Sequence, residues 1–219
     1  MGKTLASTVD SSLATYTEDV TKEMTDAYQM TTTFAQAAAR KVSKDVTSDA
    51  YFEKLTSEYG KIGWNITQAD DVKYEKDADE ITPKSIVDSL LDSYMEESAQ
   101  KQLSGLLDAI QEDSAGIHNF STFWWNSAST DVEKTSIAMG QVSVRNNTAS
   151  FTSLFYTFNF NSESWRGLFV DHSEAELLVK AKFLRMELNM DIYNTYKSDL
   201  ADKLGEKIKE HIDTTELDL

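Results

Sequence analysis

The sequence contains no cysteine. Disulfide bonds, thiolate metal sites and cysteine nucleophiles are therefore excluded for this chain. Histidine is scarce, with three residues, and neither an H-E-x-x-H nor an H-x-H spacing occurs. The usual sequence signals of a zinc hydrolase are therefore missing. The sequence predicts no metal site and no cofactor.

Glycine and proline are also scarce. The eight glycines are scattered, so they form neither a phosphate-binding loop nor the G-x-S-x-G turn of a serine hydrolase. The single proline, Pro83, follows Thr82, a pair typical of a helix N-cap followed by the first helical position. These absences favour a protein that is not an enzyme.

Long apolar runs are missing as well. No stretch approaches the roughly 18 apolar residues that a membrane-spanning helix needs. The first residues, MGKTLASTVDSS, lack the apolar centre of a secretory signal. We therefore expect neither a signal peptide nor a transmembrane segment, which favours a cytoplasmic location.

Positive charge is in deficit, with 21 Lys and Arg against 37 Asp and Glu, a net charge of −16. An anionic surface repels phosphate backbones, so no nucleic-acid partner is expected. Docking on anionic lipid headgroups is disfavoured for the same reason. A membrane partner stays possible without being favoured, and the expected partner is the chain itself or another protein.

Apolar residues recur every three or four positions between Ser12 and Val42, which predicts a long amphipathic helix. Ser48 has the character of an N-cap for a second helix that ends near Gly60. Residues 62–75 alternate with period two and predict a short β-hairpin.

The clearest helical signal begins at Pro83 and is predicted to end at Gly116. Its apolar stripe consists of Ile86, Leu90, Tyr94, Leu103, Leu106, Leu107 and Ile110.

Residues 136–190 have a different pattern. Four apolar segments are separated by NNT, NSES and DHSE, which are turn-like sequences. They predict an antiparallel meander of about four strands over residues 136–183. The alternation breaks at Leu184, and a four-residue apolar row then continues to Ile212, which predicts a closing amphipathic helix.

The predicted fold class is therefore α+β: N-terminal α-helices, a roughly four-stranded antiparallel meander sheet at about 136–183, and a C-terminal amphipathic helix. We expect the apolar face of the sheet to pack against the helix from Pro83 and the closing helix. A single domain over residues 1–219 is expected. A subdivision into an N-terminal helical arm, 1–80, and a helix–sheet–helix core, 81–219, stays open.

The stretch HNFSTFWWN, residues 118–126, concentrates four aromatic rings. If it is helical, Phe120, Phe123 and Trp124 share a face and Trp125 turns away; if it is extended, the rings are also split between faces. Burial explains most of such a cluster, because a large ring removes about 150–250 Å² from water. A ligand-stacking surface, a protein interface and membrane insertion are the alternatives.

A second group of candidate binding residues follows in the predicted sheet. Trp165 and Phe169 extend the aromatic surface toward Asp171, His172 and Glu174. A carboxylate beside an imidazole is typical of an acid–base pair or of two metal ligands. The same residue types also build an ordinary β-turn.

Three functions follow from these patterns. The leading hypothesis is a non-enzymatic interaction or self-assembly protein, because the first helix has no neighbour to cover it and the strand FTSLFYTFNF carries rings on both faces. The second is a membrane-active protein of the pore-forming-toxin type, soluble until a helix pair or amphipathic hairpin is released. The third is a hydrolase or metal-dependent enzyme that uses His172 and nearby carboxylates.

Overall fold

The computed structural model describes residues 3–72, 74, 80–112, 134–158, 165–173, 179–205 and 212–218. The helices of these ranges are α1 (Lys22–Arg40), α2 (Asp49–Lys61), α3 (Pro83–Tyr94), α4 (Glu97–Gln111), α6 (Met190–Leu204) and the 3-10 helix η1 (Trp165–Phe169). The strands are β1 (Lys3–Val9), β2 (Ser12–Tyr16), β3 (Trp64–Val72), β4 (Glu80–Ile81), β5 (Thr135–Arg145), β6 (Thr148–Phe158), β7 (His172–Ser173), β8 (Val179–Leu188) and β9 (Ile212–Asp218).

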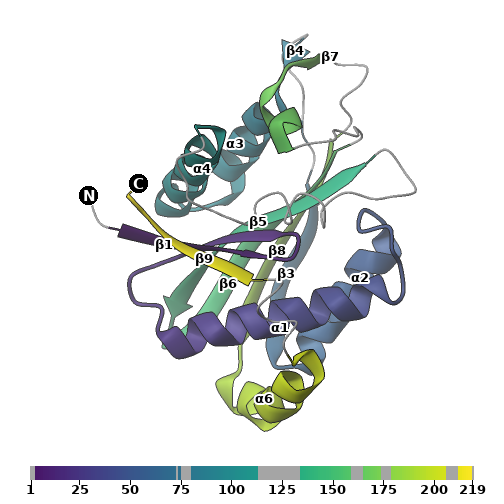
Figure 1. Cartoon of the computed structure of the whole chain (residues 1–219), viewed down its shortest axis with the longest axis vertical. Helices are drawn as coiled ribbons and strands as arrows, with labels where there is room; N and C mark the ends of the chain where they lie inside the picture. Colours follow the sequence, from purple (N-terminus) through teal and green to yellow (C-terminus); the bar gives the residue numbers. More distant parts are fainter. Residues whose placement is uncertain are drawn as a thin grey trace.

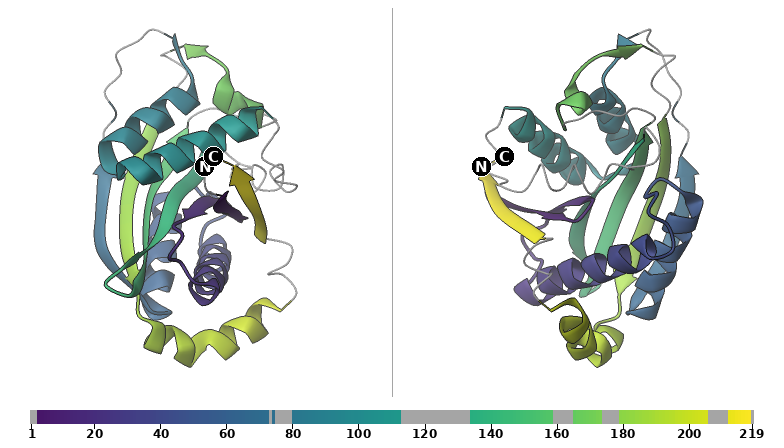
Figure 2. Two further views of the ribbon diagram at one scale, coloured as in Figure 1. Left: turned by 90° about the vertical axis from the view of Figure 1, so that its left-hand side faces the viewer. Right: turned by 45° about the vertical axis from the view of Figure 1, so that its right-hand side comes forward.

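The architecture is a central sheet between two layers of helices (Figures 1 and 2). Seven strands follow the order β3-β8-β6-β5-β2-β1-β9, while β4 and β7 form a separate two-stranded sheet. Helices α3 and α4 cover one face of the large sheet, and α1, α2 and α6 lie on the other side. The α+β class is thus confirmed. The four-stranded antiparallel sheet is wrong in detail, because the sheet is larger and β2 pairs with β5 in parallel.

The first helix begins ten residues later than the sequence pattern suggests. Residues 3–16 form the hairpin β1–β2, in which Val9 pairs with Ser12 around a turn whose Asp10 has φ 52°. α1 starts only at Lys22, where the Thr21 side chain accepts a hydrogen bond from the amide of Met24. The helical reading of residues 12–20 fails because β2 is buried on both faces, and such a strand shows no alternation.

The hairpin β5–β6 confirms the centre of the predicted meander. Asn146 and Asn147, with φ 51° and 61°, form its two-residue turn, the backbone conformation in which Asn is favoured. The strand predicted over Ser164–Asp171 is wrong, because Trp165–Phe169 form η1. The hairpin predicted at 62–75 is also wrong, since β3 is one strand that pairs with β8.

The predicted boundary between the last strand and the closing helix is wrong. β8 continues through Leu184 to Leu188, and α6 begins after the N-cap Asn189. Phe183 faces α3 and α4, whereas Leu184 faces the opposite helix layer. The alternation therefore changes phase because the buried face of β8 switches from the α3/α4 side to the α1/α2 side, and the strand continues through this point. Ile212 starts the strand β9, so it does not end the closing helix.

Two predicted helix starts are confirmed. The Thr82 hydroxyl accepts from the amide of Ser85 at 3.0 Å, and the Ser48 hydroxyl accepts from that of Tyr51 at 3.2 Å. The apolar stripe that begins at Pro83 belongs to two helices, α3 and α4, because the backbone at Met95 is extended. The predicted stop, Gly116, lies outside the described residues.

Buried side chains form one hydrophobic core on each face of the sheet. The α3/α4 core consists of Ala6, Leu13, Val72, Ile86, Val87, Leu90, Leu91, Met95, Ala99, Leu103, Leu106, Leu107, Ile110, Ile137, Met139, Leu154, Tyr156, Phe158, Leu168, Ala181 and Phe183. The α1/α2 core consists of Val9, Ala14, Tyr16, Ala27, Tyr28, Ala35, Ala39, Val46, Tyr51, Leu55, Tyr59, Ile62, Trp64, Val142, Ala149, Phe151, Leu184, Met186, Leu188, Tyr193 and Leu200. α6 joins the second core through Tyr193 and Leu200, so the closing helix packs on the face opposite α3.

Candidate functional site: two helix layers and a lysine-lined pocket

Several site residues predicted from sequence fall outside the described ranges. These residues are Phe123, Trp124, Trp125 and Glu174. The aromatic binding surface at 118–126 and a metal site that includes Glu174 therefore stay predictions.

The remaining predicted site residues lie around η1 and β7. Trp165 and Phe169 are the two ends of η1, and Phe169 is partly buried against the α3/α4 core. Asp171 is exposed, and His172 pairs with Ile81 of β4 through its backbone. Within the described ranges, no three His, Asp or Glu side chains cluster as ligands for one metal ion.

Helices α3 and α4 are linked to each other by polar side chains. The Lys84 ammonium lies 2.7 Å from the Asp88 carboxylate on α3 and 3.1 Å from that of Asp108 on α4. The Ser104 hydroxyl on α4 donates to Asp88 at 2.7 Å. A charged residue bridging both helices makes this α3–α4 hairpin one unit.

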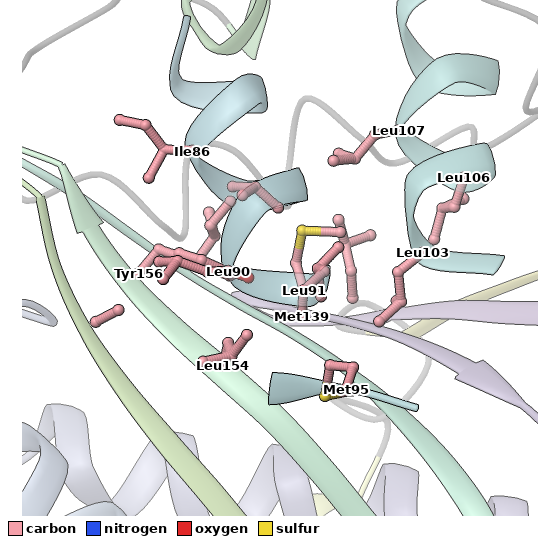
Figure 3. Packing of buried hydrophobic residues seen from close by; sticks show 14 of the residues in the cluster. Ile86, Leu90, Leu91, Met95, Leu103, Leu106, Leu107, Met139, Leu154 and Tyr156 are labelled. Atoms are coloured by element: carbon pink, nitrogen blue, oxygen red, sulfur yellow. The ribbon is translucent and has the colours of Figure 1, made fainter. Parts of the chain in front are cut away.

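The hairpin covers the sheet with apolar side chains. Figure 3 shows the side chains of Leu90 and Leu91 from α3, and of Leu103 from α4, directed toward Met139 and Leu154 of the sheet. All five are at most 3% exposed. The contact is therefore hydrophobic and non-directional.

Polar contacts also join the hairpin to the sheet, through Gln141 and Arg145 of β5. The Gln141 side-chain amide on β5 donates to the side-chain oxygen Oε1 of Gln102 on α4 at 2.8 Å. Arg145, at the end of β5, forms an ion pair with Glu96, the N-cap residue of α4. The Glu96 and Arg145 side chains are 67% and 37% exposed, and an exposed pair contributes about 1 kcal/mol or less to stability.

On the other face, α1 is attached through buried hydrogen bonds. The Gln36 side chain, 1% exposed, accepts from the amide and hydroxyl of Ser11 at 3.0 and 2.9 Å. Its amide nitrogen donates to the Ser12 hydroxyl at 2.8 Å and to the Val9 carbonyl at 3.2 Å. The Trp64 indole of β3 donates to the Thr31 hydroxyl of α1 at 2.9 Å.

The two helix layers therefore differ in how they could separate from the sheet. Removing α1 would leave buried polar groups without partners, which costs about 1–3 kcal/mol for each group. Removing the α3–α4 hairpin would mainly expose apolar surface, a cost that disappears when another apolar phase takes the place of the partner. The α1 layer is thus attached to the sheet through buried hydrogen bonds, whereas the α3–α4 layer is attached mainly through apolar side chains.

A pocket of about 200 Å³ opens at one end of the sheet, on the face that carries the α1/α2 core. Lys180 and Lys182 of β8 and Lys134, just before β5, line it together with the first turn of α2. Phe52 of α2 meets Phe155 of β6 edge to face, with 5.3 Å between ring centroids. We call this site the lysine pocket.

Lys182 is the lysine of this pocket with neighbouring carboxylates. Its ammonium hydrogen-bonds the Asp71 carboxylate at 2.7 Å and lies 3.5 Å from that of Asp49. The hydrogen bond raises the pKa of Lys182 and lowers the pKa of Asp71. The same ammonium lies 5.2 Å from the centroid of the Phe52 ring. The charge of Lys180 contributes to the lowered pKa of Asp71 as well. Among the described residues, no ion pair involves Lys134 or Lys180.

Sequence reasoning missed both the lysine pocket and the attachment of α1. The alternation of Lys180 and Lys182 with apolar residues is visible in the sequence and places both lysines on one face of the strand. Nothing in the sequence places Lys134 or the start of α2 beside them, because strand order and helix placement bring these segments together.

Comparisons with known proteins assign no family. No family model matches the sequence, and no curated protein matches it. Among the described helices, none combines the length and the apolarity that a membrane crossing requires.

The fold has weak similarity to solved structures. A delta-endotoxin is 11% identical, with 84% of this chain and 86% of that chain covered and a TM-score of 0.41. The activated Cyt2Ba monomer from Bacillus thuringiensis subsp. israelensis is 14% identical, with 81% and 96% covered and a TM-score of 0.44. The Evf virulence factor is 9% identical, with 93% and 82% covered and a TM-score of 0.37. Similarities of this size place the chain in no family.

Proposed function

We propose that this chain is a membrane-active protein of the pore-forming-toxin type, in which the α3–α4 hairpin leaves the sheet and binds a lipid bilayer. One observation carries the proposal: the hairpin is linked internally by Lys84 and Ser104, yet contacts the sheet mainly through apolar side chains. It is a unit that can exchange one apolar surface for another.

The released hairpin would lie in the membrane interface. At 1.5 Å per residue, α3 and α4 are roughly 18 and 22 Å long, which is too short to cross a hydrocarbon core of about 30 Å. Their apolar faces suit a position between headgroups and acyl chains. The sheet face left behind, with Met139, Leu154 and Tyr156, also needs cover, and the same bilayer or a second copy of the chain would supply it.

The net charge of −16 determines which kind of membrane the chain is expected to bind. An anionic leaflet repels an anionic protein before any apolar contact forms. We therefore expect activity on zwitterionic bilayers.

Dye release from phosphatidylcholine vesicles tests the proposal. The purified chain should release an entrapped dye, with a rate that increases with protein concentration. A variant with Leu103→Asp would replace a buried apolar residue of the hairpin by a charge, and it serves as a folding-sensitive comparison. Intact vesicles at every protein concentration, pH and lipid composition tried would contradict the proposal.

Self-assembly is the other function that stays a prediction. The two features that suggested it are covered within the chain: α1 packs on the sheet, and Phe151 is 1% exposed in the α1/α2 core. Phe155, on the same strand face, contacts Phe52 of α2. Light scattering over a concentration series would test assembly, and a monomer at all concentrations without lipid would contradict it.

A further inference from the structure

We infer that the lysine pocket binds the phosphate group of a small phosphomonoester. The inference does not depend on membrane activity, because the pocket lies on the opposite face of the sheet from the α3–α4 hairpin. Its basis is that three lysines and the rings of Phe52 and Phe155 line one hollow.

The first step is the local charge. Three of the chain's 21 lysine and arginine residues line this one pocket, although the whole chain carries −16. Across the sheet, Ser136 pairs with Thr157, which pairs with Lys180, and the next row brings Phe155 beside Lys182. β-sheet register therefore fixes Lys180 and Lys182 on one wall, and Lys134 enters from the start of β5.

The second step is the set of carboxylates that face these lysines. Asp71 and Asp49 lie beside Lys182, and Asp45 accepts from the amide and hydroxyl of Thr47 at 2.9 and 2.5 Å. The charge of Lys180 also lowers the pKa of Asp71, but neither Lys134 nor Lys180 forms an ion pair within the described ranges. An oxyanion between these two lysines would gain charge-assisted hydrogen bonds.

The third step is the size and polarity of the pocket. About 200 Å³ exceeds the volume of an inorganic phosphate ion and is smaller than the roughly 300–1,000 Å³ of sites for drug-sized ligands. Phe52 and Phe155 offer apolar surface next to the lysines. A phosphate attached to a small organic group would place its charge beside the lysines and its organic part against the two rings. The hydroxyls of Ser136 and Thr157, which also line the pocket, can donate to its oxygens.

The test is calorimetric titration of the full chain with phenyl phosphate at constant ionic strength, with inorganic phosphate as a second probe. We expect phenyl phosphate to bind more tightly than inorganic phosphate. Lys134→Gln and Lys180→Gln should each weaken binding by roughly tenfold, the loss of one charge-assisted hydrogen bond. Lys22→Gln is the matched control, because the exposed Lys22 pairs with Asp26 in the first turns of α1 and does not line the pocket.

Asp49→Asn should strengthen the binding of phenyl phosphate, whereas the two lysine substitutions weaken it. Removing this carboxylate leaves Lys182 paired with Asp71 and makes the pocket more positive, so phenyl phosphate should bind more tightly. Thermal melts of each variant establish that the fold is kept. No binding by the wild type, or equal binding by Lys180→Gln and Lys22→Gln, would overturn the inference.

A competition arm identifies the source of the phosphate. Vesicles that contain phosphatidic acid present a phosphomonoester on a membrane. The competition is run in salt that screens the repulsion between the anionic chain and these vesicles. Displacement of phenyl phosphate then shows that the pocket recognises a lipid headgroup, and no displacement shows that its ligand is a soluble phosphomonoester. This result is independent of dye release, so failure of the membrane proposal leaves the binding measurement interpretable.

Discussion

Gly140 is a residue that the packing of β5 against β6 requires. A Cβ atom there would lie 2.5 Å from the Thr152 carbonyl oxygen and 2.6 Å from atoms of Phe151 and Ser153. Gly60, near the end of α2, differs because a Cβ atom there would have nothing within 4 Å. In a chain with so few glycines, the two positions thus have different reasons to lack a side chain.

Substitution at these two positions should change stability in opposite directions. We expect Gly140→Ala to lower the free energy of unfolding by about 1–3 kcal/mol, the usual cost of overpacking. Gly60→Ala should raise it by about 0.5–1 kcal/mol, since alanine is the better helix former. Urea denaturation measures both. Equal effects of the two variants would contradict the close approach at Gly140.

Glu58 illustrates an electrostatic effect of a single residue. Its carboxylate accepts from Lys54 at 2.5 Å and from Lys61 at 2.8 Å, and these hydrogen bonds lower the pKa of Glu58. Because the pKa in the folded state is below that in the unfolded state, the stabilisation is complete above the unfolded-state pKa. It is lost as the pH falls through the folded-state pKa.

Glu58→Gln should therefore destabilise the protein at pH 7 and not in strong acid. Both lysines are partly exposed, so we expect a loss of less than about 1 kcal/mol at neutral pH. Denaturation of both proteins between pH 7 and pH 3 measures the difference, which should shrink toward the acidic end. A constant difference over that range would contradict the role of the carboxylate charge.

At the scale of elements, the sequence predicts the two capped helix starts at Thr82 and Ser48, but neither the start of α1 nor the end of β8. Thr82 and Ser48 were identifiable because a cap is a local interaction, made within three residues. The end of β8 and the existence of β2 could not be predicted, because each depends on which faces of the strand are covered by helices. Leu184 and Leu188 have helical spacing only because the second helix layer buries this half of the strand.

The candidate site, too, could be predicted from the sequence only where it depends on neighbouring residues. An aromatic cluster and a His–carboxylate set are visible in a sequence, but the cluster at 118–126 and Glu174 lie outside the described residues, and Asp171 and His172 form no metal site within them. The difference between the two helix layers could not be predicted, because it depends on Gln36 reaching Ser11 and Ser12 across 24 to 25 positions of sequence.

The two helix layers should respond differently to loss of one amide side chain. Gln36→Ala leaves buried groups at Ser11 and Val9 unpaired, and we expect a loss of about 2–3 kcal/mol. Gln102→Ala removes a partly buried hydrogen bond to Gln141, with an expected loss of about 1 kcal/mol. Urea denaturation of both variants measures the comparison. A larger effect of Gln102→Ala would contradict the fixed attachment of α1.

At the scale of the whole molecule, the membrane proposal predicts that net charge governs the encounter with a vesicle. With −16 on the chain, dye release at low salt should be slower from vesicles with anionic lipid than from phosphatidylcholine vesicles. Added salt screens the repulsion, so the two rates should converge as the salt concentration rises. Faster release from anionic vesicles at low salt would show that net charge does not govern the encounter.

Release of the α3–α4 hairpin is the central claim, and a covalent tether tests it most directly. Because the chain has no cysteine, Glu96→Cys with Arg145→Cys introduces a single pair that a short bismaleimide can join, tying the α3–α4 turn to β5. The matched control is Glu23→Cys with Lys197→Cys, which joins α1 and α6 at another exposed ion pair, 3.8 Å apart. We predict that the first cross-link reduces dye release to the level of protein-free vesicles, while the second leaves it unchanged. Equal dye release by the Glu96–Arg145 variant before and after cross-linking would contradict the account.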